Sequence, residues 1–187
     1  MKYFIDTEQT RKWKGHTLYR IIPYDHEDLG GWIETKEVEN DILPQYGPCM
    51  AWEGTMLLKG ARLFGYAQAW GHGIIEGTVG DQVHLYGFYH IGRNAVVGGF
   101  AKIIGTNPDA PTTIGDYAQV HGEPAFILDS EIRDNAVIWG EVEVIGSKVT
   151  GAAKIEPSGM NDSVLVAKST ISDMPLYTSA RIIGADV

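Results

Sequence analysis

A nine-residue unit that occurs five times in the middle of the chain limits this sequence to very few folds. Each copy begins with an aliphatic residue, places small or aliphatic residues four and six positions later, and ends with glycine. The copies are LFGYAQAWG (63–71), VGDQVHLYG (79–87), VGGFAKIIG (97–105), IGDYAQVHG (114–122) and IRDNAVIWG (132–140). Their first residues are separated by 16, 18, 17 and 18 residues. Such a period predicts a solenoid, in which each repeat stacks on the next.

Within each unit the hydrophobic pattern has the two-residue period of a β-strand, so alternate side chains face opposite sides. Two inward-facing stacks are predicted: Ala67, Val83, Ala101, Ala118 and Ala136, and then Ala69, Leu85, Ile103, Val120 and Ile138. A period of about 18 residues accommodates three strands of about six residues, which is typical of the hexapeptide-type, single-stranded parallel β-helix. We therefore predict an all-β parallel β-helix, left-handed as is typical of such coils. An antiparallel sandwich would not require this register.

Residues that lack the repeat precede the solenoid and are predicted to form a small β cap. Strands are expected at 2–5 and 17–22, with a hairpin turn at Lys14 and Gly15. A cap is expected because the end of a solenoid exposes unpaired strand edges and an open apolar core. The predicted division is an N-terminal cap at 1–48 and a parallel β-helix at 49–187, with regular repeats at 63–146 and less regular coils at 147–187.

Two loops are predicted to interrupt the strands, and few helices are predicted. Thr106–Thr113 contains two prolines and an Asn-Pro step, so it is expected to leave the solenoid as a turn or short excursion. A second loop is expected at Glu156–Ser163. No stretch shows a sustained 3.6-residue period, so helix content should be low.

Composition excludes several classes of protein. The 23 glycines among 187 residues are not spaced as triplets, which excludes collagen. The formal net charge of −9 argues against direct binding to nucleic acid, where a basic surface neutralises phosphates. No apolar run approaches the roughly 18 residues that cross a bilayer, and residues 1–6 lack the pattern of a signal peptide. We therefore expect a cytoplasmic protein with no membrane contact, and Cys49, the single cysteine, cannot form an internal disulfide.

A resemblance to a known family rests on two segments of the head and on the repeats. The segments are TLYRI at 17–21 and DLGGWIE at 28–34, and the repeats are glycine-punctuated Ala-x-Val-x-Gly units. Together they resemble a bacterial and phage group of hexapeptide-repeat β-solenoid proteins described as acyltransferase-like or polymer-forming-like. The sequence departs from that group in its irregular spacing and in the long stretch at 35–48. The resemblance implies the solenoid fold and a bacterium or phage-infected bacterium as the source, but not an activity, because fold does not fix function.

The DLGGWIE segment provides a candidate cap motif. Its members are Asp28, Gly30, Gly31, Trp32 and Glu34. The paired glycines are followed by Trp-Ile rather than by a helix, so a tight turn explains them better than a phosphate-binding loop does.

The residue pattern gives little support for a catalytic site or a metal site. An acyltransferase of this architecture needs a histidine as general base, and His72, His84, His90 and His121 are the candidates. None lies in a recognisable motif, and no basic cluster suits the phosphates of coenzyme A. His84 and His90 are six residues apart, which does not match the three-histidine zinc site of solenoid carbonic anhydrases. Cys49 has no adjacent histidine and is expected to be a packed small residue. We predict no catalytic residue, no metal and no cofactor.

The most informative predicted surface feature is a column of outward-facing apolar and aromatic residues. Its members are Trp70, Tyr86, Ile104, His121 and Trp139, which occupy the same position in successive units. They are expected to stack about 4.8 Å apart along one face. Exposed apolar ladders of this kind mark interfaces. We expect self-association, with a trimer favoured, or alternatively a surface for a different protein or a planar ligand.

These observations favour a non-enzymatic β-solenoid binding or scaffold protein that self-associates. As a phage product it would act on a host protein or on a small molecule. The alternative is an acyl-CoA-dependent hexapeptide-repeat acyltransferase, which would require a histidine and basic residues converging at a groove between subunits.

Overall fold

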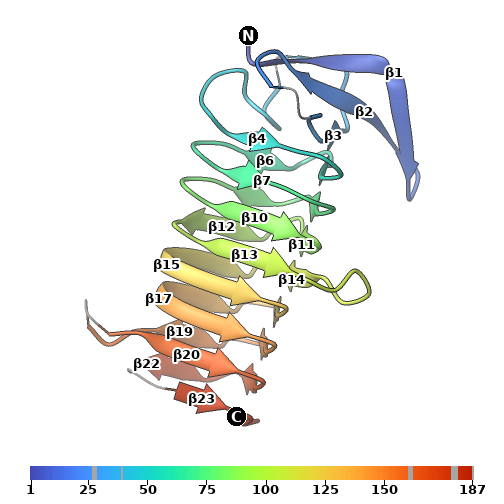
Figure 1. The fold of residues 1–187 in the computed structure, drawn as a ribbon. Helices are drawn as coiled ribbons and strands as arrows, with labels where there is room; N and C mark the ends of the chain where they lie inside the picture. Colours follow the sequence, from blue (N-terminus) through green and yellow to red (C-terminus); the bar gives the residue numbers. More distant parts are fainter. Residues whose placement is uncertain (27–28, 39, 160–161, 178–180, 187) are drawn as a thin grey trace.

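Stacked β-strands and the turns between them dominate the computed structural model, which describes residues 1–26, 29–38, 40–159, 162–177 and 181–186. These residues contain 23 strands and no helix, and they make about seven turns of a β-solenoid with about 18 residues per coil (Figure 1). The prediction of an all-β parallel β-helix is therefore confirmed. Accordingly, none of the described residues belongs to a helix that is long and apolar enough to cross a membrane.

The coils have three faces, which we call faces I, II and III in the order in which the chain visits them. Face I comprises β4 (Met50–Ala51), β7 (Gln68–Ala69), β10 (His84–Gly87), β13 (Lys102–Gly105), the second halves of β15 (Gln119–Leu128) and β17 (Val137–Ile145), β20 (Val164–Ala167) and β23 (Arg181–Ile183). Face II comprises β3 (Trp32–Ile33), β5 (Met56–Leu57), β8 (Ile74–Ile75), β11 (Tyr89–Ile91), β14 (Thr112–Ile114), β16 (Glu131–Ile132), β18 (Lys148–Thr150) and β21 (Thr170–Ser172). Face III comprises β6 (Arg62–Leu63), β9 (Thr78–Val79), β12 (Val96–Gly99), the first halves of β15 and β17, β19 (Lys154–Glu156) and β22 (Pro175–Tyr177).

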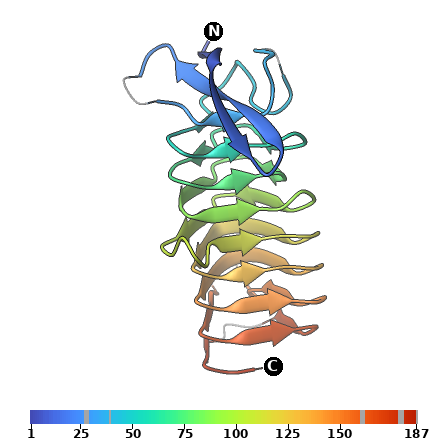
Figure 2. The ribbon, with the colours of Figure 1, turned by 90° about the vertical axis from the view of Figure 1, so that its right-hand side faces the viewer.

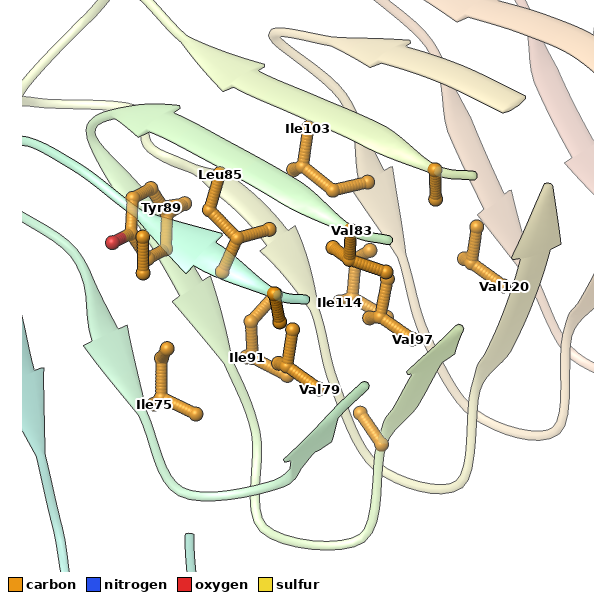
Figure 3. Close-up of a cluster of buried hydrophobic side chains, with 14 of the residues drawn as sticks. Ile75, Val79, Val83, Leu85, Tyr89, Ile91, Val97, Ile103, Ile114 and Val120 are labelled. Carbon is orange, nitrogen blue, oxygen red and sulfur yellow. The ribbon is translucent and has the colours of Figure 1, made fainter. Parts of the chain in front are cut away.

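Each face contributes one column of aliphatic side chains to the core (Figure 3). Parallel pairing places equivalent residues of successive coils in register, so that Leu85 lies between Ala69 and Ile103 on face I. On face II, Ile91 lies in the same way between Ile75 and Ile114. All six of these residues are buried. The core is therefore narrow and continuous along the solenoid, with each coil contacting its neighbours.

The corner between faces I and II is polar, unlike the other two. The residues at or just before the start of each face II strand are buried there: Thr55, Gly73, Tyr89, Thr112, Ser130, Ser147 and Ser169. Their hydroxyls link successive coils, because Ser130 Oγ accepts a hydrogen bond from the Ser147 amide and Ser147 Oγ accepts one from the Ser169 amide, both at 3.1 Å. Backbone groups that would otherwise be buried without partners are thereby satisfied.

All ten residues of the two predicted inward stacks are buried. However, the five aligned units do not lie on the same faces of the solenoid, because the face changes between the third and fourth units. The first three units run from face III to face I, whereas the units at 114–122 and 132–140 run from face II to face III. Ile103 consequently pairs with Ile127 and not with Val120. The chain between Gly105 and Thr112 leaves the stack as the predicted excursion, seen beside β14 in Figure 1, and its extra residues displace the register.

The head of the chain forms the predicted hairpin and then joins the first coil. β1 (Tyr3–Trp13) pairs antiparallel with β2 (His16–Pro23), and the turn residues Lys14 and Gly15 have φ of 43° and 88°. Figure 2 shows this hairpin at the N-terminal end of the stack. β3 pairs antiparallel with β2 on one side and parallel with β5 on the other. Parallel stacking thus begins at β3, inside the range predicted as the cap.

Candidate functional site

The five residues predicted to form one outward column lie on two different faces. Tyr86 pairs in register with Ile104 on face I, and the backbone amide of Trp70 donates to the carbonyl of Leu85, which places Trp70 in the preceding coil of the same face. His121 pairs with Trp139 on face III. The prediction of a single ladder through all five is therefore wrong. The error arises from the change of face after Gly105. Alternation in the sequence indicates that a side chain points outward, but it does not indicate to which face of the coil that side chain belongs.

The two residues on face III form a separate contact. The rings of His121 and Trp139 lie 5.0 Å apart, and 45 % of Trp139 is exposed. Four acidic residues line the pocket beside Trp139, namely Glu123, Glu141, Glu156 and Asp162.

The face I column is longer than predicted and begins at an additional tryptophan. Its members are Trp52, Trp70, Tyr86, Ile104, Leu128, Ile145, Ala167 and Ile183. The rings of Trp52 and Trp70 are stacked 4.8 Å apart with an interplanar angle of 14°. His26, from the loop after β2, packs edge-on against Trp52 at 4.9 Å. Parallel strands enforce this stacking because they repeat the same side-chain position in every coil.

A groove of about 670 Å³ opens where this aromatic ladder meets the cap. Its floor is formed by the ladder and by the neighbouring outward residues of face I, and its walls come from the loops that precede β3 and β4. The lining residues are Lys2, Pro23, Asp25, His26, Gly47, Pro48, Met50, Trp52, Gln68, Trp70, His84 and Tyr86. Trp52 is only 4 % exposed and its Nε1 donates to Gln68 Oε1 at 2.8 Å, so the floor is held in place.

Some polar groups of the groove make hydrogen bonds within the protein, whereas others are exposed. Lys2 Nζ donates to the Cys49 carbonyl at 2.6 Å and contacts its Sγ at 3.4 Å, and burial lowers the pKa of this lysine. Cys49 is buried, as predicted. Asp25 and His26 are exposed. His84 Nδ1 lies 3.0 Å from Tyr86 Oη. The groove thus offers aromatic surface together with exposed acidic and basic groups.

The cap motif lies at the junction between hairpin and solenoid, outside the groove, with Asp28 outside the described residues. A Cβ on Gly30 would lie 2.6 Å from the Ile21 carbonyl oxygen, and one on Gly31 would lie 2.5 Å from the carbonyl oxygen of Thr55. Neither glycine has a positive φ, and Gly30 forms a β-bridge with Trp52. The prediction of a tight turn is therefore wrong, because close backbone approach is what requires these glycines.

The last two motif residues bind the hairpin to the first coil. The guanidinium of Arg20 lies 4.9 Å from the Trp32 ring. Glu34 contacts His16 Nδ1 at 2.7 Å and accepts a hydrogen bond from the Lys59 amide at 2.8 Å. These contacts are structural.

The other candidate histidines are dispersed. His72 stacks on Phe88 at 5.6 Å, and His90 Nε2 lies 3.0 Å from Glu76 Oε2. Within the part of the chain that the structure describes, no three His, Cys, Asp or Glu side chains come together in a way that could hold a metal ion.

No family model matches the sequence, and no curated protein matches it.

Sequence reasoning found Trp70, Tyr86 and His84 but missed Trp52 and His26. Trp52 precedes Trp70 by 18 residues, one full period, and both follow an alanine. Extending the repeat one coil towards the N-terminus would have revealed it. His26 carries no such signal, because its position depends on how the cap folds back.

Proposed function

We propose that this protein is a non-enzymatic β-solenoid that binds a planar ligand in the groove beside its cap. The observation that carries the proposal is the aromatic ladder along the groove floor, in which the buried Trp52 stacks on Trp70 and the half-buried Trp70 and Tyr86 present the accessible surface. An aromatic face stacks on planar groups, at about 1–3 kcal/mol per base in nucleic-acid complexes. The groove volume of about 670 Å³ lies in the range of small-molecule sites.

The ligand class is a flat, conjugated molecule with polar edges. The exposed Asp25, His26 and His84 supply both hydrogen-bond acceptors and donors around the aromatic floor. A small number of polar groups around an apolar surface fixes the orientation of a ligand. We propose that the protein holds such a molecule in a bacterial or phage-infected cell without acting on it chemically.

An acyl-CoA-dependent acyltransferase is the second candidate. The observation that favours it is His84, an exposed imidazole beside Tyr86 at the same groove. Imidazole is the usual general base for acyl transfer to a hydroxyl or an amine, and the adenine of coenzyme A is a planar group.

Thermal shift measurements test the proposal with named probes. Adenosine, ATP, acetyl-CoA and free tryptophan are each added to the protein, with glucose as a non-planar control. We expect at least one planar probe to raise the melting temperature, since a ligand stabilises the state that it binds. The shift should be lost in Trp70→Leu and retained in Trp139→Leu, which removes an exposed tryptophan from face III. Each variant is compared with its own unliganded melting temperature.

The outcomes separate the two candidates. If no planar probe shifts the melting temperature, or if Trp139→Leu loses the shift as fully as Trp70→Leu, planar-ligand binding in the groove is excluded. Release of free thiol from acetyl-CoA in the presence of amine acceptors, abolished in His84→Gln, would establish the acyltransferase instead.

A further inference from the structure

Face I presents two outward columns over its whole length, at the front of the molecule in Figure 1. One is the apolar column that runs from Trp52 to Ile183. The other contains Met50, Gln68, His84, Lys102, Phe126, Glu143, Leu165 and Arg181. The face is therefore a continuous apolar stripe beside a column in which charged residues are spaced by uncharged ones. Such a stripe is an unusual surface to leave in water.

The charged residues of face I lack the ion pairs that the other faces make. Among the described residues, the ion pairs join His16 with Glu34, His90 and Arg93 with Glu76, Arg133 and Lys148 with Glu131, and Lys154 with Glu156. All of these lie on faces II and III or at their edges. Lys102 and Glu143 are exposed on face I, in the coils before and after that of Phe126. Two coils separate them by about 10 Å, too far to pair with each other.

We propose that face I docks against face I of a second copy of this chain, with the two solenoid axes antiparallel. The two-fold axis passes through the coil of Phe126 and Leu128, parallel to the strands. This symmetry places Lys102 opposite the partner's Glu143, and Glu143 opposite the partner's Lys102. The interface is isologous, so one complementary pair is made twice.

The same symmetry also matches the apolar column. Ile104 faces the partner's Ile145, and Leu128 faces its own copy on the axis. Tyr86, the bulkier residue, faces the partner's Ala167. Apolar side chains thus meet apolar side chains, which leaves the charged column to pair with itself.

Other arrangements of two copies place charges badly. With parallel axes, each column faces the other column, so Lys102 lies over Ile104. Moving the antiparallel axis one coil towards the N-terminus sets Lys102 against Lys102. Moving it one coil towards the C-terminus sets Glu143 against Glu143 and Lys102 against Arg181. Like charges in direct opposition disfavour such complexes strongly, so among these arrangements the register at Phe126 is favoured.

The size of the face indicates how tight this dimer is. In this register seven strands of each copy overlap, from β7 to β23, and at about 4.8 Å per strand they give a length of about 29 Å; four to five residues per strand give a width of about 15 Å. Each copy then buries about 430 Å², or about 860 Å² in total, which is the size of weak, transient complexes. The dimer should therefore be concentration-dependent.

Sedimentation equilibrium at protein concentrations on the order of 10 to 200 µM measures the association. We expect the wild type to reach twice the 20.5 kDa of one chain. Lys102→Glu and Glu143→Lys should each weaken the dimer at least tenfold, because each creates like-charge opposition across the axis. The double variant Lys102→Glu/Glu143→Lys restores both pairs with reversed polarity and should recover the dimer. Arg62→Glu, on face III, is the matched control and should leave the dimer unchanged.

A monomeric wild type, single variants that associate like the wild type, or a double variant as weak as the single ones would overturn the proposal. A threefold mass would overturn it as well and would support the trimer expected from the sequence. Far-UV circular dichroism of every variant verifies the fold. The interface covers Trp70, His84 and Tyr86, which also line the groove, so a second copy and a planar ligand would compete for this end of face I. The charge variants change Lys102 and Glu143, which lie outside the groove lining, and the thermal shifts are measured below the protein concentrations at which the chain dimerises, so failure of one proposal is distinguishable from failure of the other.

Discussion

Gly73 and Tyr89 form a matched small and large pair at the polar corner between faces I and II. Tyr89 is 1 % exposed, and its hydroxyl lies 2.8 Å from Thr55 Oγ1, two coils back. The ring therefore spans the coil of Gly73. A Cβ added to Gly73 would lie 1.9 Å from Cε2 of this ring. Gly73 has no positive φ, so the ring alone, and not the backbone, excludes a side chain at this position.

We predict that Gly73→Ser and Tyr89→Ser are each strongly destabilising and that they compensate each other. Gly73→Ser should reduce the free energy of unfolding by about 3 kcal/mol, at the upper end of overpacking effects, because the buried ring has no space into which to move. Tyr89→Ser should reduce it by about 3–5 kcal/mol through loss of the ring and the cavity left behind. The double variant continues the serine column of the same corner and should be less destabilised than the sum by at least about 2 kcal/mol.

Urea unfolding followed by far-UV circular dichroism measures all four proteins, provided that they share one m value. Additivity within about 0.5 kcal/mol would refute the reasoning, since residues without a shared contact behave in that way. A Gly73→Ser variant as stable as the wild type would refute it too, because the 1.9 Å approach would then be relieved without loss.

Three further predictions concern the same framework. Ser147→Ala should destabilise by about 1–3 kcal/mol in urea unfolding, because the buried Ser169 amide loses its acceptor, whereas Ser172→Ala on the surface should change stability by less than about 0.5 kcal/mol. Arg20→Ala should destabilise by about 2–3 kcal/mol and expose the hairpin to limited proteolysis, since Arg20 contacts the Trp32 ring and donates to the Glu53 carbonyl at 3.0 Å. Burial opposes ionisation of Glu34, but the Lys59 amide and His16 outweigh it and hold the pKa of Glu34 below its usual range. A depressed folded pKa contributes stability above the unfolded value of about 4.3 that is lost as pH falls through the folded value, so the melting temperatures of Glu34→Gln and wild type should differ at pH 7 and converge near pH 3.

The buried positions of the solenoid were predictable because the pattern that encodes them is local. Ala118 and Ile138 were assigned inward from alternation within one unit, and both are buried. A strand repeats its inward side every second residue whichever face it belongs to. Local alternation is therefore sufficient to decide which side chains enter the core.

The face of each strand was not predictable in the same way. Ile114 follows Val97 by 17 residues and so looked like its successor, yet Val97 pairs with Val120. The excursion after Gly105 adds residues within one coil, so an almost normal spacing connects positions on different faces. The two apolar corners, between faces III and I and between faces II and III, both use an aliphatic residue, a turn and a small residue. The nine-residue pattern therefore does not distinguish these two corners, and the predicted outward column wrongly joined residues of two faces after Ile104.

The same reasoning explains why only half of the groove floor was found. Trp70 and Tyr86 lie in the first two units of the repeat, and the register between them is regular. Trp52 lies in the coil before the first recognised unit, and His26 reaches the groove only because the cap folds over face I. When a site lies between a repeat and a non-repeating segment, neither of the two alone identifies all of its residues.

The residues that carry the family resemblance have a structural explanation that involves no ligand. Gly30 and Gly31 let the chain pass close to Ile21 and Thr55, and Trp32 continues as the strand that converts an antiparallel hairpin into a parallel stack. Any chain that begins a β-solenoid from such a hairpin must solve this problem, whatever the solenoid binds. A shared head motif therefore indicates a shared way of starting the solenoid fold and does not indicate a shared chemical activity. Outward residues of face I such as Lys102, which is exposed, are under no such constraint. Differences in function among proteins with this head should accordingly be sought on that face.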